Sequence, residues 1–518
     1  MNILLLSMST FPYLENKEDE KDKPRRLRKS RFTYMNNKVE EYYSQLEPIT
    51  RVLIENGNKP DEVIALCTKA SATEREYRLD DDKIDTKSPL DFYISRITEV
   101  ADKNNTIKYK KFPQGEDTYL DPNDTKSKNS AIAEIALYLL SKKNDPENNE
   151  ELHLWIDTQG GMRDVSLLMN AVVSLLKTSD IKIEGIYSIN YTDGIGNVIE
   201  QNDTYHIFDF VSGMNEFIQY GRADQLVKYY GLNNKSTNAN IPALVTQMKE
   251  LADSIMLCDL NRFDKGLTEI KKTLDKWDEN NESNNVLLNI FVEQIKDDYK
   301  EILKKDVSGV DKIKWFHKKK LYQQTLTYIE SNGPKDWERS RVITFSCTEV
   351  NGDTDRLPSL TNMVNHYIGY ITYGISENME ESHTEALDTL LKEGNDGLKY
   401  WKTNKNGKKR KLLKDSINAI NRKTEKGKTE EKIIYKYKVE SRKKYDNEEE
   451  QEEQLYKLIA FYKLIKLERN LFNHMDNGNV ENNDECKNKQ RMQIDKLDIL
   501  IDSYVDTCET LCRMKNKS

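Results

Sequence analysis

Short apolar runs alternate with amphipathic stretches through the first part of the chain. The runs are rich in leucine, isoleucine and valine and are bounded by polar turns, a pattern typical of strands buried on both faces of a sheet. Between them, apolar residues recur every three or four positions, as they do on one face of a helix. This alternation predicts an α/β domain with a parallel sheet and helices on both faces. The expected strands are 2–8, 61–68, 107–113, 151–158 and 181–191, and the expected helices are 36–56, 129–142 and 164–177.

The pattern becomes helical beyond about residue 210, where residues 210–231 are expected to form a helix that leaves the sheet. The expected fold class is therefore an α/β amino-terminal domain followed by an all-α carboxyl-terminal region. We divide the chain into 1–215, a helical part 216–330, and 331–518. The further helices are expected at 245–260, 267–277, 286–303, 315–329, 452–475 and 492–514.

Two segments of the second half admit more than one structure. Val342–Phe345 is either a short strand or a buried turn. Residues 402–444 hold 17 lysine or arginine residues and five aspartate or glutamate residues. Such a basic stretch forms either a hairpin or loop arm that contacts RNA phosphates, or a solvated insertion.

Composition narrows the class of protein. The chain has 518 residues, of which 37% are hydrophobic and 32% charged, with a mean hydropathy of −0.81. These values indicate a soluble, folded protein of several domains, and no apolar run approaches the roughly 20 residues of a membrane span. Asn2–Met8 lacks a basic leader and is interpreted as a buried strand, not as a signal peptide. Six scattered cysteines with no CxxC pair and no nearby histidine predict reduced thiols in the cytoplasm and no zinc site. We expect neither a metal nor a cofactor.

Polar and glycine residues follow two of the expected strands. In parallel sheets the ligand site lies beyond the carboxyl ends of the strands, and paired glycines let a phosphate or base approach the backbone of a helix start. The segment Trp155–Arg163, which contains the paired glycines, lacks the GxGxxG fingerprint and the P-loop lysine. We therefore expect a nucleotide-like ligand held by backbone amides. A tight turn without a ligand is the alternative. The candidate ligand-binding residues are Ser9, Thr10, Thr158, Gln159, Gly160, Gly161 and Arg163.

A second candidate lies near the end of a helical run, at Arg469, Asn470 and His474. A guanidinium can stabilise charge on a phosphate attacked by the ribose 2′-hydroxyl, and an imidazole can move protons near neutral pH. On a helix Arg469 points about 140° away from His474, so one copy is half a site and two copies facing each other would complete it. The alternative is a surface arginine beside a histidine used in packing. His153 is interpreted as a packed core residue, and His317, His366 and His383 as structural.

An α/β domain ahead of a helical half with Arg-Asn-x3-His resembles the CARF–HEPN ribonucleases of type III CRISPR systems. The resemblance covers most of the chain but nothing is recognised across 331–450. It implies a Rossmann-like CARF domain that binds cyclic tetra- or hexa-adenylate in a homodimer. The family's ligand-contacting positions correspond to Ser9, Thr10, Thr158, Gly160, Gly161 and Arg163.

The resemblance also implies a metal-independent HEPN domain that cuts single-stranded RNA and leaves a 2′,3′-cyclic phosphate. Arg469, Asn470 and His474 fall on its catalytic motif. Gln159 departs from the hydroxyl or smaller residue expected at its position, which leaves the ring size of the activator open. Some CARF domains cleave their activator slowly, and Ser9, Thr10 and Thr158 are the candidates for that activity.

Three other functions fit parts of the sequence. The first is a CARF-type nucleotide sensor that acts as a non-catalytic, nucleic-acid-binding regulator. The second is a HEPN toxin without a small-molecule trigger. The third is an α/β metabolic enzyme with a helical oligomerisation half, although the first 215 residues hold no evident nucleophile–base pair.

Overall fold

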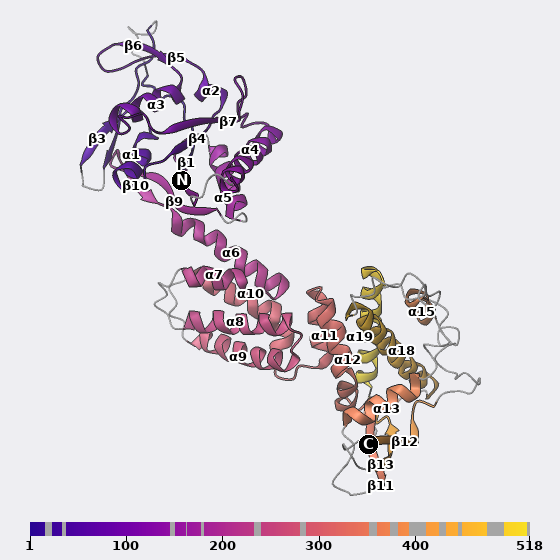
Figure 1. Ribbon diagram of the computed structural model, residues 1–518. Coiled ribbons are helices and arrows are strands. Elements are labelled where there is room, and N and C mark those ends of the chain that lie inside the picture. The colour runs from indigo at the N-terminus through magenta and orange to yellow at the C-terminus, as the bar shows by residue number, and fades with distance from the viewer. Residues whose placement is uncertain are drawn as a thin grey trace. The chain divides into compact units, whose positions relative to one another are not determined.

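The computed structural model describes most of the chain, which divides into two compact units, Met1–Phe208 and Asp209–Ser518 (Figure 1). The described residues are 1–15, 23–33, 38–145, 151–161, 163–177, 181–232, 240–279, 286–351, 360–372, 382–392, 411–423, 431–443, 448–473 and 492–514.

Unit 1, Met1–Phe208, is built on an eight-stranded sheet with the order β3-β2-β10-β9-β8-β1-β4-β7. The five strands from β9 to β7 run parallel, as expected, whereas β10 is antiparallel to β9 and β3 to β2, so the sheet is mixed. A separate hairpin pairs β5 with β6. The strands are β1 Asn2–Ser7, β2 Ser30–Thr33, β3 Val39–Tyr42, β4 Glu62–Leu66, β5 Arg75–Arg78, β6 Ile84–Lys87, β7 Lys108–Phe112, β8 His153–Asp157, β9 Lys182–Thr192 and β10 Ile195–Glu200.

Helices cover both faces of this sheet. Alternate residues of β1 point to opposite faces, which explains its uninterrupted apolar run. Leu4 and Leu6 pack with α1 and α3, and Ile3 and Leu5 pack with α4 and α5 on the other side (Figure 1). The helices are α1 Glu47–Glu55, α2 Lys69–Ala72, α3 Pro89–Val100, α4 Thr125–Lys143 and α5 Arg163–Lys177.

One predicted element of unit 1 is wrong over part of its length. A single helix was expected at 36–56, but the chain forms β3 at Val39–Tyr42 and α1 begins only at Glu47. The cause is tertiary, because β3 is one of the two edge strands of the sheet and pairs with β2. A polar edge strand lacks the apolar alternation that identifies interior strands.

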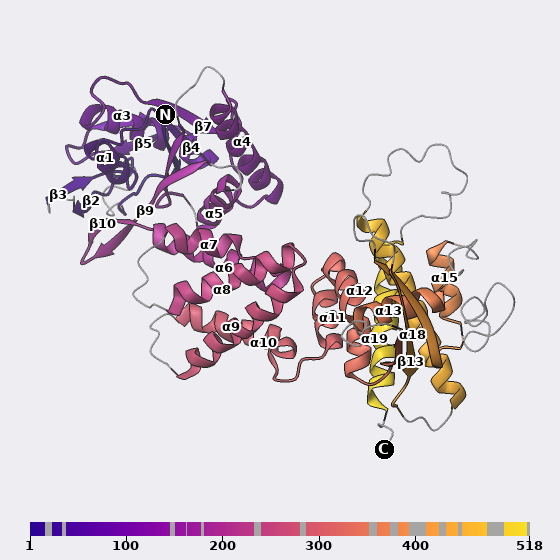
Figure 2. The same cartoon turned by 60° about the horizontal axis from the view of Figure 1, so that its bottom comes forward.

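Unit 2, Asp209–Ser518, is mainly helical and shares one continuous apolar core. The predicted helix 210–231 is divided in two at Gly221, whose φ is +64°, and the predicted helix 315–329 is divided at Lys320, whose φ is +57°. Figure 2 shows α12, α18 and α19 side by side, and these helices pack against one another. The helices are α6 Asn202–Tyr220, which begins in unit 1, α7 Asp224–Leu232, α8 Asn240–Met256, α9 Leu260–Glu279, α10 Val286–Leu303, α11 Gly309–Lys318, α12 Tyr322–Arg339, α13 Leu360–Thr372, α15 His383–Leu390, α18 Glu448–Asn473 and α19 Ile494–Arg513.

Unit 2 also contains a three-stranded antiparallel sheet, so the all-α expectation needs correction. Its order is β11-β13-β12, with β11 Thr344–Asn351, β12 Lys414–Lys423 and β13 Glu431–Glu440. On β13 the buried residues Tyr435, Tyr437 and Val439 alternate with the half-exposed Lys436 and Lys438. The basic stretch therefore contains an antiparallel strand pair, and its expected contact with RNA stays a prediction.

Candidate functional site

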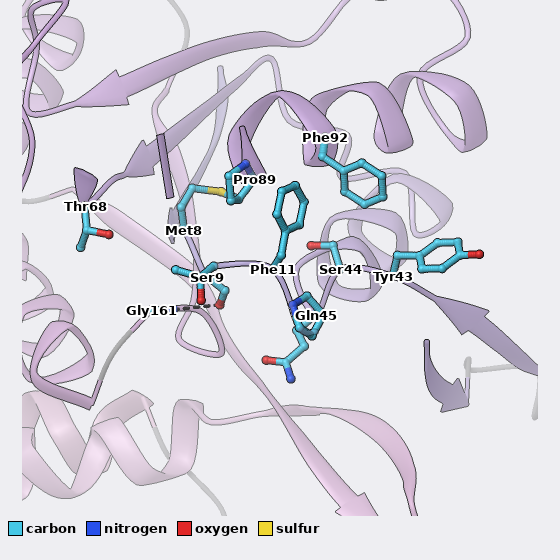
Figure 3. Close-up of a pocket in the computed structure, with 12 residues that line it drawn as sticks. Met8, Ser9, Phe11, Tyr43, Ser44, Gln45, Thr68, Pro89, Phe92 and Gly161 are labelled. Carbon is cyan, nitrogen blue, oxygen red and sulfur yellow. Dashed lines mark hydrogen bonds between the residues drawn. The ribbon is translucent and has the colours of Figure 1, made fainter. Parts of the chain in front are cut away.

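The carboxyl ends of β1 and β8 lie next to each other because these strands are paired in parallel. Ser9 follows β1, and the turn Gly160-Gly161 follows β8. The N–H of Gly161 donates a hydrogen bond to the Ser9 Oγ at 3.0 Å (Figure 3). The structure thus joins two of the predicted ligand-binding segments at one edge of the sheet.

The two glycines are required by the turn itself. A Cβ on Gly160 would lie 1.8 Å from the carbonyl oxygen of Ser7 and 2.8 Å from the Leu46 Cδ2. Gly161 has a φ of +85°, which other residues rarely adopt. Gly160 is therefore explained by the close approach of the turn to β1 and Gly161 by its backbone conformation, whether or not a ligand binds there.

Thr158 and Gln159 connect the turn to β9. The Thr158 hydroxyl donates to the carbonyl oxygen of Tyr187 at 2.9 Å, and the Gln159 Oε1 accepts from the N–H of Ile189 at 3.0 Å. These two side chains therefore help to shape the turn. Arg163 is the first residue of α5. Only its backbone is described, so the position of its side chain stays a prediction.

A pocket of about 290 Å³ opens at this edge of the sheet (Figure 3). Its size is near the lower end of small-molecule sites. Of the lining residues, Ser9, Thr10 and Gly161 were predicted from the sequence. The aromatic residues Phe11, Tyr43 and Phe92 were not, and neither was Thr68, although it also follows a parallel strand, β4. The lining residues are Met8, Ser9, Thr10, Phe11, Pro12, Tyr43, Ser44, Gln45, Thr68, Pro89, Phe92 and Gly161.

A buried carboxyl lies at the base of the turn. Asp157 is fully buried at the end of β8, and its Oδ1 accepts the N–H of Gln159 at 2.8 Å. Its Oδ2 is buried and has no hydrogen-bond partner within the described residues. Burial raises the pKa of Asp157 to about 7. In α1, burial likewise raises the pKa of Glu47 to about 7, although the nearby Arg96 opposes the shift.

Asp157→Asn should reduce the pH dependence of the stability of unit 1. Folding favours the protonated Asp157 because its pKa rises from 3.8 to about 7. The stabilisation is complete below about pH 4 and is lost as the pH rises to about 7, at about 1.4 kcal/mol per pKa unit, or a few kcal/mol in all. Urea unfolding between pH 4.5 and 7.5 measures the effect. Glu47 titrates in the same direction, so Asp157→Asn should keep part of the slope, and an unchanged slope would refute the prediction.

The second candidate site is on α18. The Arg469 side chain is 29% exposed, and its Nε lies 3.1 Å from the Oε2 of Glu330 on α12. Asn470 is half-buried at the next position. His474 lies outside the described residues, so the geometry of the arginine–histidine set stays a prediction.

Aromatic contacts hold α12 and α18 together at this point. The Tyr462 hydroxyl donates to the backbone carbonyl of Glu330 at 3.0 Å, and the Tyr462 ring meets Trp337 edge to face at 5.1 Å between centroids. The Trp337 Nε1 in turn donates to the hydroxyl of Tyr504 on α19 at 3.2 Å. Arg469 thus projects from a helix whose neighbours are firmly packed.

The residue before the motif is also constrained. Glu468 is fully buried, accepts the N–H of Met492 at 3.2 Å and contacts the Nδ1 of His383. The sequence offered no partner for His383, yet the structure supplies one beside the motif. The structural role expected for His317 agrees with its contacts to Asp498 at 2.7 Å and Asp502 at 3.1 Å.

His153 is less buried than a core residue. Its Nδ1 lies 2.5 Å from the Glu184 Oε1, and it begins β8, at the end of that strand away from the Gly160-Gly161 turn. His153 therefore lies at the opposite end of β8 from the candidate ligand site.

The sequence matches no protein-family model and no curated protein. Within the described ranges, none of the helices combines the length and the apolar character that crossing a bilayer requires.

Proposed function

We propose that this protein is a metal-independent endoribonuclease activated by a cyclic oligoadenylate. Unit 1 is the CARF-like sensor and unit 2 the HEPN-like ribonuclease, and two chains form a homodimer. The observation that carries the proposal is the placement of Arg469 and Asn470 at half-buried positions of α18, with the arginine held by Glu330. It is supported by a separate α/β unit whose strand ends form a pocket.

The chemistry requires no covalent intermediate with the protein. The ribose 2′-hydroxyl attacks the adjacent phosphorus, the bond to the 5′-oxygen of the next nucleotide breaks, and a 2′,3′-cyclic phosphate remains. Arg469 stabilises the charge that develops on the phosphoryl oxygens, and His474 transfers the proton. Asn470 positions the RNA beside them.

The sensor uses neutral donors of unit 1. The Ser9 Oγ accepts the N–H of Gly161, which leaves the Ser9 hydroxyl proton to donate to a phosphate oxygen of the activator. A ring with internal symmetry suits a site shared by two identical chains. Activator binding favours cleavage only if the active arrangement of the two HEPN-like units binds the ring more tightly than the inactive one.

A fluorescent-RNA assay in EDTA tests the proposal. Cleavage should occur with one of cyclic tri-, tetra- or hexa-adenylate and be far slower without it. Activator binding without cleavage would favour a non-catalytic regulator. Cleavage that ignores all three rings would favour a ribonuclease without a small-molecule trigger.

Ser9→Ala should change the free energy of activator binding more than it changes the free energy of unfolding of unit 1. The change removes the acceptor of the Gly161 N–H and the donor offered to the ligand, so we expect Kd to rise about tenfold, which corresponds to one charged hydrogen bond. Calorimetric titration with the activating ring measures it. Ser141→Ala is the matched control, because the Ser141 hydroxyl donates to the backbone carbonyl of Tyr138 on α4, outside the pocket lining, and this variant should keep the wild-type affinity. Equal affinity in both variants and the wild type would contradict this role for Ser9.

A further inference from the structure

Two lysines precede the motif on α18, at Lys463 and Lys466. The Nζ of Lys466 lies 3.9 Å from the Glu330 Oε1, at the outer limit of an ion pair, and Glu330 is also the partner of Arg469. Glu330 is thus shared between two cations, and the ammonium of Lys466 is too far from it for a hydrogen bond.

Lys463 has an unusual environment for a lysine. It is half-buried, and in the described part of the chain no carboxylate forms an ion pair with it. Burial and the neighbouring charge of Lys466 both lower the pKa of Lys463. A half-buried ammonium is costly unless an anion compensates it. By contrast Lys457, on the same helix, pairs with Glu453 at 2.9 Å.

Helix geometry places both lysines beside the motif. Lys466 is four residues before Asn470 and Lys463 is seven, so all three lie on one face of α18. At about 1.5 Å of rise per residue, these lysines lie about 6 and about 10.5 Å along the axis from Asn470. Arg469 flanks the same face. The two lysines therefore form a cationic strip that leads to the candidate cleavage site.

We propose that Lys463 and Lys466 form a subsite that binds backbone phosphates of single-stranded RNA next to the bond that is cut. This inference rests on the proposed ribonuclease function and extends its substrate site by two residues. A phosphate supplies the negative charge that Lys463 lacks within the described structure and that Lys466 shares with Arg469. Lysines act here as point charges, so the subsite tracks the backbone and does not select bases.

The test measures binding separately from cleavage. The full-length protein is titrated with fluorescent 2′-O-methyl RNA, which lacks the attacking hydroxyl, and anisotropy is followed at several salt concentrations with the activator present. Lys463→Gln and Lys466→Gln should each weaken binding roughly five- to tenfold and reduce the slope of log K against log salt by about 0.7. Lys463→Arg should retain binding, and Lys457→Gln, the matched control, should behave as the wild type.

The outcomes separate the subsite from the function. Unchanged affinity and salt slope in both glutamine variants would overturn the subsite, even if the wild type cuts RNA. A wild type that never cuts RNA would refute the ribonuclease, while the anisotropy data would still decide whether the strip binds RNA. Lys463→Gln should unfold at or above the wild-type temperature because it removes repulsion from Lys466. A lower unfolding temperature together with a lost salt slope in Lys463→Gln alone would assign Lys463 a structural role and overturn the two-lysine subsite.

Discussion

Arg469→Ala should lower the rate of RNA cleavage by about 10²- to 10³-fold while the activator still binds. The loss follows because the guanidinium is the group that stabilises charge on the attacked phosphate, and removing one such donor has an effect of this size. Multiple-turnover cleavage of fluorescent RNA gives the rate, and calorimetric titration gives activator affinity. Activator affinity should stay at the wild-type value because Arg469 belongs to unit 2 and the candidate pocket to unit 1.

Removing Arg469 also leaves Glu330 without its closest cation, so a folding defect must be distinguished from a catalytic one. Arg469→Lys keeps a positive charge near Glu330 but lacks the planar fork, so it should remain folded and still lose most activity. Arg513→Ala is a matched control, since this arginine is 79% exposed on α19 and pairs with Glu509. Retained cleavage in a folded Arg469→Ala, His474→Ala double variant would rule out the assignment of the catalytic motif.

Gly160→Ala should destabilise unit 1 by about 2–3 kcal/mol and abolish measurable activator binding. The added Cβ would lie 1.8 Å from the carbonyl oxygen of Ser7, and backbone cannot move aside as a flexible side chain can. Overpacking of this kind forces the turn away from β1 and separates Gly161 from Ser9. Thermal unfolding followed by circular dichroism, together with calorimetric titration of the activator, measures both effects.

Gly231→Ala is the matched control for this substitution. Gly231 lies in α7, where an added Cβ meets nothing within 4 Å, and alanine favours a helix over glycine. This variant should be as stable as the wild type or slightly more stable. If Gly160→Ala had the unfolding temperature and the activator affinity of the wild type, the turn would not be as tightly packed as described.

The five parallel strands of unit 1 were predicted, whereas β2, β3, β5, β6 and β10 were not. The apolar runs of β1, β4 and β8 identify these strands without tertiary information, because the strands are almost entirely buried between parallel neighbours. The helices α4 and α5 were predicted for the related reason that one face of each packs on the sheet. Strand β3 was missed because its hydrogen bonds to β2, and not its side chains, make it a strand.

The candidate sites were only partly predictable. The rule that ligands bind beyond strand ends led to Ser9 and Gly161, which the structure joins by a hydrogen bond. The same rule could not show that the side chains of Thr158 and Gln159 bond to β9, because that depends on which strand lies beside β8. In unit 2 the motif marked Arg469, but its partner Glu330 belongs to a helix far away in the chain.

By itself the amino-acid sequence determined which segments are buried on both faces and which chemical groups are available, since burial periodicity and side-chain chemistry are local properties. Only the tertiary structure decided which of those groups meet. It placed Gly160 against Ser7, left Asp157 buried with an unpartnered oxygen in the described structure, and held Arg469 beside Glu330. Such contacts depend on the packing of distant segments, which the order of residues along one segment does not contain.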